Sequence, residues 1–136
     1  MTMSAATQLQ EAIFTALNAD AALGFMLEGI YDEAPQEATY PYLSMGESRF
    51  RDAGLKGTSG AEVSFDLMIW SNDPGQMQIK ELMAAVETSL ETAEITLSGH
   101  DLVTLRLESA TCVRQWNEAG SLYRGRLAYR ALVYAT

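Results

Sequence analysis

The sequence predicts an α+β domain, in which an antiparallel β-sheet of about four long strands is backed by two main helices. Apolar residues recur at helical spacing in two segments, 5–18 and 74–92. Apolar and polar residues alternate strictly over 62–70, which predicts a strand with one buried face. The order helix, strand, strand, helix, strand, strand is typical of an antiparallel sheet with a helical layer.

The N-terminal part is predicted to be helical and then irregular. Leu9, Ile13 and Leu17 share one face of a helix over 5–18. Asn18 and Asp20 can each cap a brief second helical segment that extends through residue 27. Residues 30–39 contain a proline and several acids, so we expect a loop there.

Two strands with a glycine-rich connection follow. Tyr40, Pro41 and Tyr42 open an extended run to about residue 51, because a residue before proline avoids helical geometry and aromatic residues favour strands. The strand over 62–70 is the clearest in the sequence. Residues 52–60 contain three glycines, so we expect a flexible Gly-rich arm between the strands.

The second half repeats the pattern of a helix followed by strands. Asp73 and Pro74 resemble a cap and a first helical position, so a helix should begin there and end near Thr92. A short strand over 95–97, a turn at 98–99 and a long strand over 102–113 should follow. A turn at 117–121 then leads into a last strand over 122–134.

The last strand separates aromatic and apolar residues from arginines. Tyr123, Leu127, Tyr129 and Val133 fall on one face by alternation. The other face carries a row of three arginines: Arg124, Arg126 and Arg130. Core-facing tyrosines and exposed arginines explain this pattern more simply than the stacking surface of a single-strand nucleic-acid binder.

Composition indicates one soluble globular domain over residues 1–136. The chain is 48% hydrophobic and 20% charged, and 136 residues suffice for a core without metals or disulfides. One cysteine and one histidine exclude an internal disulfide and a Cys/His zinc site. We expect no cofactor, no membrane or secretory targeting, and synthesis in a reducing cytoplasm.

The charge is unevenly distributed. The chain has 9 basic and 18 acidic residues, a net charge of −9, which opposes non-specific binding to nucleic-acid backbones. Residues 1–48 contain acids but no lysine or arginine, whereas residues 101–136 contain five arginines and three acids. The molecule therefore has an acidic part and a basic part, which suits contacts between unlike surfaces.

Residues with catalytic potential are better explained as structural. His100 and Asp101 are adjacent, so on a strand they would point to opposite faces and could not form a relay. Cys112 lacks a base within sequence reach, which indicates a half-buried structural cysteine. The glycines at 54, 57 and 60 lack the lysine and following helix of a phosphate-binding loop.

Several strings, in order, resemble one family. Residues 30–36 lead into Tyr-Pro-Tyr at 40–42, a strand ends in Trp-Ser at 70–71, and Leu-Ser-Gly-His stands at 97–100. The final strand contains Tyr-Arg-Gly-Arg-Leu at 123–127. Together these strings, which span about residues 9–134, resemble the tail-completion, or tail terminator, proteins of siphophage-like tails, found in phages, prophages and gene transfer agents.

The resemblance implies a structural, non-enzymatic role in the tail or neck of a virion or phage-like particle made in a bacterial cytoplasm. It implies a homo-hexameric ring that terminates the tail tube, docks on the neck stopper or head-completion protein, and leaves a channel for double-stranded DNA. The bottom-up alternatives are a small soluble α+β enzyme or ligand-binding domain with a dispersed site and, less well supported, an acidic DNA mimic.

The resemblance and the charge distribution together suggest three sets of candidate residues. Subunit-interface candidates, expected to meet the acidic N-terminal part of a neighbour, are Arg106 and Arg114 or the row Arg124, Arg126 and Arg130. Candidates for an arm that contacts the tail tube or a neighbour are Arg49, Arg51, Lys56 and Gly57. Channel-wall candidates are Glu81, Glu87, Glu91, Glu94, Asp32, Glu33 and Glu37.

Overall fold

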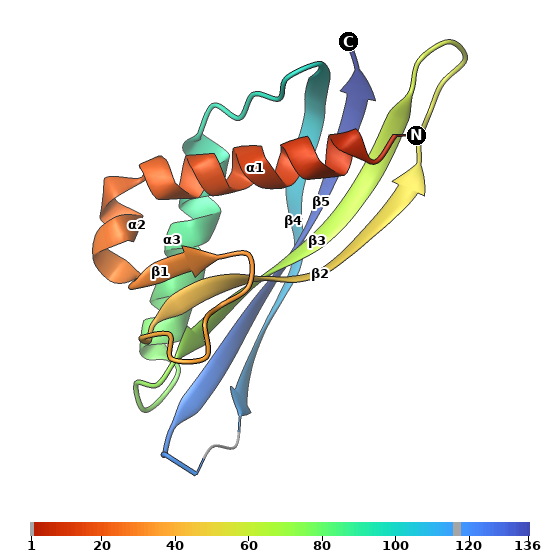
Figure 1. Cartoon of the computed structure of the whole chain (residues 1–136). Helices are drawn as coiled ribbons and strands as arrows, with labels where there is room; N and C mark the ends of the chain where they lie inside the picture. Colours follow the sequence, from red (N-terminus) through yellow and green to blue (C-terminus); the bar gives the residue numbers. More distant parts are fainter. Residues whose placement is uncertain (1, 116–117) are drawn as a thin grey trace.

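A computed structural model describes residues 2–115 and 118–136. Two long helices, α1 and α3, lie on one side of a twisted sheet, and the described chain places no helix on the other side (Figure 1). The helices are α1 (Ser4–Ala19), α2 (Ala21–Met26) and α3 (Met77–Thr92). The strands are β1 (Gly29–Tyr31), β2 (Tyr42–Asp52), β3 (Gly60–Ser71), β4 (His100–Gln115) and β5 (Leu122–Ala135).

The strands form one sheet in the order β1-β2-β3-β5-β4. The four long strands pair antiparallel, which confirms the predicted α+β architecture. The loop prediction for residue 30 onward was wrong at its start, because β1 pairs parallel with β2, Gly29 opposite Tyr42. A strand of three residues is too short to show alternation, so sequence periodicity cannot detect it.

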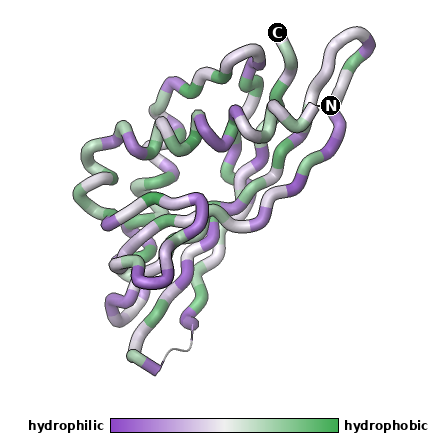
Figure 2. The backbone as a smooth tube through the Cα atoms, in the orientation of Figure 1, coloured by the Kyte–Doolittle hydropathy of each residue, from purple (hydrophilic) through white to green (hydrophobic). Residues whose placement is uncertain are grey.

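The core lies between the helical layer and one face of the sheet. Leu9, Ile13 and Leu17 of α1 are at most 2% exposed, and the predicted stripe of α3 is likewise buried. Val63, Phe65, Leu67 and Ile69 of β3 face these helices, together with the odd-numbered residues from Leu127 to Val133 of β5. Hydrophobic and hydrophilic residues alternate along the long strands (Figure 2), as the one-sided burial requires.

Three predicted boundaries shift. Helix α3 begins at Met77, not at Pro74, because Gly75 has a φ of 90° that no helix accommodates. The predicted strand over 95–97 is reduced to a single bridge between Leu97 and His100. Residues 118–120 form the predicted turn before β5, while Asn117 lies outside the described residues.

The glycine-rich connection is a hydrogen-bonded hairpin tip, not an open arm. Leu55 and Thr58 exchange two backbone hydrogen bonds of 2.9 Å, which places Lys56 and Gly57 at the turn. Gly57 has a φ of 80°, a value that glycine adopts without strain. The tip projects beyond the N-terminal end of α1 (Figure 1), and its residues 54–58 are exposed.

Helix α3 approaches β5 closely at Gly125. A Cβ at this position would lie 2.8 Å from Sδ of Met83 and 3.2 Å from a side-chain carbon of Ile79. We expect Gly125→Val to lower the free energy of unfolding by about 1–3 kcal/mol, because an inserted side chain must displace α3. Gly24→Ala is the control, since a Cβ there meets nothing within 4 Å. Urea denaturation checks both, and equal stability of Gly125→Val and wild type would contradict the packing described.

Candidate assembly surfaces

The sheet face opposite the helices, here called the open face, collects most of the basic residues. Cross-strand register places six arginines on it. They are Arg49, Arg51, Arg106, Arg124, Arg126 and Arg130. Five carboxylates share the face: Glu47, which acts electrostatically on Arg126, and Glu62, Asp66, Asp101 and Glu108.

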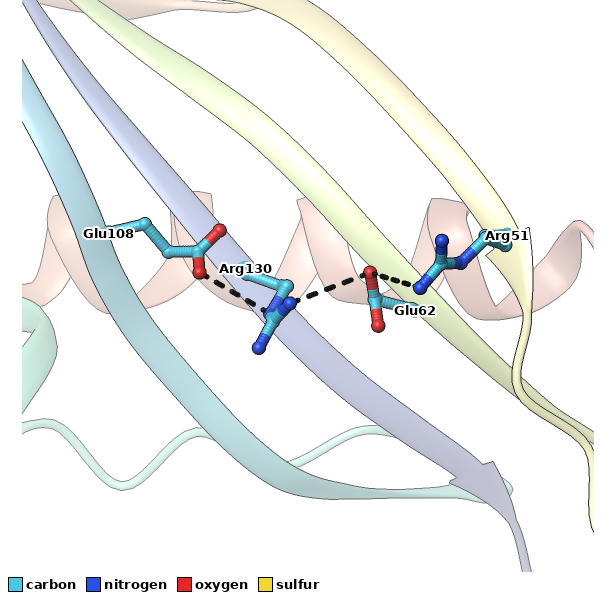
Figure 3. Close-up of polar contacts among 4 residues, drawn as sticks. All are labelled: Arg51, Glu62, Glu108 and Arg130. Carbon is cyan, nitrogen blue, oxygen red and sulfur yellow. Dashed lines mark ion pairs between the residues drawn. The ribbon is translucent and has the colours of Figure 1, made fainter.

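Ion pairs within the chain neutralise much of this face. Arg126 Nε donates a hydrogen bond of 2.8 Å to Asp66 Oδ2, whose side chain is only 12% exposed. This bond and the nearby charge raise the pKa of Arg126. Arg130 lies 3.6 Å from Glu108 and 3.8 Å from Glu62, and Arg51 lies 3.6 Å from Glu62. These four side chains form a chain of ion pairs across β4, β5, β3 and β2 (Figure 3).

The arginines predicted as interface residues therefore fall into different groups. Arg126 and Arg130 have carboxylate partners within their own chain. Arg124 lies between Trp70 and Val113 in the cross-strand register, and its buried Nε has no hydrogen-bond partner among the described residues. Arg106 and Arg114 are exposed on β4, but Arg114 pairs with Tyr123 and so faces the helical side. The structure does not gather the five into a single patch.

The helical side and the loops carry the acidic excess. The open face has six arginines and five carboxylates, which give it a net charge of +1. Because the whole chain has a net charge of −9, the remaining residues carry a net charge of −10. The residues predicted to form the channel wall lie on the helical side and in the loops, in two separate groups. Glu81, Glu87, Glu91 and Glu94 lie on or just after α3, whereas Asp32, Glu33 and Glu37 lie between β1 and β2.

The two edges of the sheet differ in charge. Strand β4 forms one edge, where exposed Arg106 and Arg114 share the strand with exposed Asp101 and Glu108. Strand β1 forms the other, and exposed Asp32 and Glu33 follow it directly. The acidic segment after β1 of one copy can bind the arginines on the β4 edge of another copy, an arrangement that suits head-to-tail contacts.

A pocket of about 280 Å³ lies beside the β4 edge. Its walls come from Glu87, Leu90 and Glu91 of α3, residues 105–107 of β4 and Tyr129 of β5. Tyr129 is 4% exposed, and its hydroxyl has no hydrogen-bond partner among the described residues. Burial, reinforced by the charges of Glu87 and Glu91, raises the pKa of Tyr129, so the hydroxyl stays protonated. Sequence periodicity placed Tyr129 in the core but could not reveal this unpaired hydroxyl.

The surroundings of His100 and Cys112, the residues considered for catalysis, indicate structural roles. His100 is half-buried, with Nδ1 2.7 Å from Oε1 of Gln8, so it connects β4 to α1 rather than standing free in a solvated turn. Burial raises the pKa of the Cys112 thiol, an effect that Lys80 opposes. Within the described part of the chain, no group of three or more His, Cys, Asp or Glu side chains could hold a metal ion.

A second, wider pocket of about 630 Å³ lies between α1 and the connection from α3 to β4. Glu11, Asp20 and Glu94 line it together with small and hydroxyl-bearing residues. Ile95 and Leu97 also line it, and the groove is partly open to solvent, unlike the closed pocket expected of a ligand-binding domain. No helix in residues 2–115 or 118–136 has the length and apolar character needed to cross a membrane.

The family model of the tail completion protein gp17 matches residues 11–134. The chain belongs to this family. A chain of the solved virion of a native gene transfer agent particle is 30% identical, with a TM-score of 0.85, over 98% of this chain and 100% of that one. The gp17 protein of bacteriophage SPP1 has the same fold, with 16% identity and a TM-score of 0.65, over 96% of this chain and 91% of that one. No match was found among curated proteins.

Membership identifies the chain as a structural protein of the virion tail, which confirms the resemblance and the localisation inferred from sequence. It also accounts for the surface features of the chain. The chain presents a sheet with charged edges, a projecting hairpin and an open face stabilised by its own ion pairs. These features suit a subunit of an assembly.

The tail-completion fold should depend on the Arg126–Asp66 pair more than on the more exposed pairs beside it. Asp66→Ala leaves a half-buried guanidinium without its 2.8 Å partner, so we expect a clear fall in melting temperature. Glu62→Ala, which removes contacts of 3.6 and 3.8 Å at a more exposed position, should cause a smaller fall. Calorimetry of the two variants checks the order, and an equal or reversed order would refute it.

Proposed function

We propose that this tail-completion protein forms a homo-hexameric ring. The ring terminates the tail tube at its head-proximal end and joins it to the stopper or head-completion protein of the neck. The observation that carries this proposal is the presence of exposed arginines on the β4 edge and of an acidic segment after β1, at the other edge of the sheet. The match to a gene transfer agent virion supports assembly within a phage-like particle.

Unlike edges favour a heterologous contact. In such a contact each copy uses one surface to bind the next copy and a different surface to bind the previous one, and the series closes when the rotation fits. Arg106 and Arg114 of one subunit then face Asp32 and Glu33 of the next. The row of Arg124, Arg126 and Arg130 contributes less, because it lies on β5, an interior strand of the sheet.

The ring leaves a channel for double-stranded DNA, which passes without specific binding. A wall that held DNA would do so through many phosphate contacts, so a neutral or acidic wall suits a conduit. The acidic excess of −10 outside the open face can supply such a wall, with Glu81 and Glu94 of the α3 region as candidates. In this proposal Arg49 and Arg51 lie near the tube or a neighbour, beside the hairpin.

Two double variants that change the net charge by the same amount test the proposed contact. Asp32→Lys with Glu33→Lys should weaken ring formation, most strongly at low salt, because the introduced lysines repel Arg106 and Arg114 of the next subunit. Glu81→Lys with Glu94→Lys should leave rings intact. Native mass spectrometry and negative-stain microscopy measure the hexamer fraction. Rings that tolerate the first pair as well as the second would exclude the acidic edge from the contact.

A further inference from the structure

The pocket beside β4 contains an unexplained buried polar group. The Tyr129 hydroxyl lacks a hydrogen-bond partner among the described residues, although buried polar groups are almost always paired. Glu87 and Glu91 stand one helical turn apart at the same pocket. Glu87 and Glu91 give the pocket its negative charge, because the Arg106 side chain lies on the open face, and the walls include Leu90, Leu105 and Leu107. It therefore offers three acceptor groups, two carboxylates and one phenol, within an apolar frame.

The hairpin tip between β2 and β3 has the complementary chemistry. Leu55 is 66% exposed, an unusual state for a large apolar side chain, and Lys56 follows it at the turn. Lys56 has no ion-pair partner among residues 2–115 and 118–136. A lysine ammonium has three N–H donors and no acceptor, which matches two carboxylates and a phenol oxygen.

The positions of tip and pocket exclude a contact within one chain and suit a contact between copies. The tip ends the β2–β3 hairpin, whereas the pocket lies beside β4, at the edge of the sheet farthest from β2 (Figure 1). One protruding group and one receptor on opposite sides of a subunit generate a head-to-tail series. The same polarity follows from the charged edges.

We propose that the hairpin tip of each subunit inserts into the α3–β4 pocket of the next, with Lys56 bound by Glu87, Glu91 and the Tyr129 hydroxyl and Leu55 packed against Leu105 and Leu107. This inference rests on the proposed ring and names the contact that closes it. It assigns Glu87 and Glu91 to a subunit interface rather than to the channel wall.

Zero-length coupling of amines to carboxylates tests the contact directly, because Lys56 and Lys80 are the only lysines in the chain. Treatment of assembled rings with a carbodiimide should join Lys56 of one subunit to Glu87 or Glu91 of another, giving a ladder of linked species and an identifiable peptide. Lys80, which is exposed on α3, serves as the internal control. Rings in which Lys56 couples to other carboxylates, or not at all, would overturn the inference while leaving the ring itself intact.

A charge exchange gives an independent measurement. Lys56→Glu should raise the protein concentration needed for half-assembly by about tenfold or more, whereas Lys80→Glu should leave it unchanged. Combining Lys56→Glu with Glu91→Lys should restore much of the assembly, because the two charges are exchanged. If circular dichroism shows that the single and the double variant are both folded and assembly is still not restored, the contact is refuted. A wild-type protein that never forms rings, alone or on tails, would refute the proposed function instead.

Discussion

The pairing of β3 with β5 is the constraint on which the rest of the structure depends. From Gly60 opposite Tyr134 to Ser71 opposite Tyr123, the two strands keep their apolar residues on one face. That face buries against α1 and α3, so every charged side chain of β5 must lie on the other. The open face and its ion pairs follow from this alternation.

Ion pairs on the open face explain much of the arginine row without a partner from another subunit. A row of exposed arginines in an acidic protein suggests partners in another subunit, but Asp66, Glu62 and Glu108 from neighbouring strands already bind Arg126 and Arg130. The ion-paired open face is thus a surface stabilised by its own chain. The acidic excess remains elsewhere, so contacts between copies are better sought at the edges of the sheet and at the hairpin.

The sequence revealed features that depend on periodicity and missed those that depend on pairing. Leu9, Ile13 and Leu17, the alternation of β3 and the two faces of β5 were predictable, because burial imposes a repeat. Strand β1 and the hydrogen bonds between Leu55 and Thr58 were not, since both depend on partners rather than on composition. The pocket at Tyr129 also lay beyond prediction, because α3, β4 and β5 supply its walls from distant parts of the chain.

The most direct test of the central claim is a cryo-electron microscopy map of the assembled ring at side-chain resolution. The proposed ring predicts six subunits related by head-to-tail contacts, with Lys56 of each within hydrogen-bond distance of Glu87 or Glu91 of the next. A closed ring whose hairpin tips lie in solvent, or whose subunits meet through the open faces of their sheets, would contradict this account.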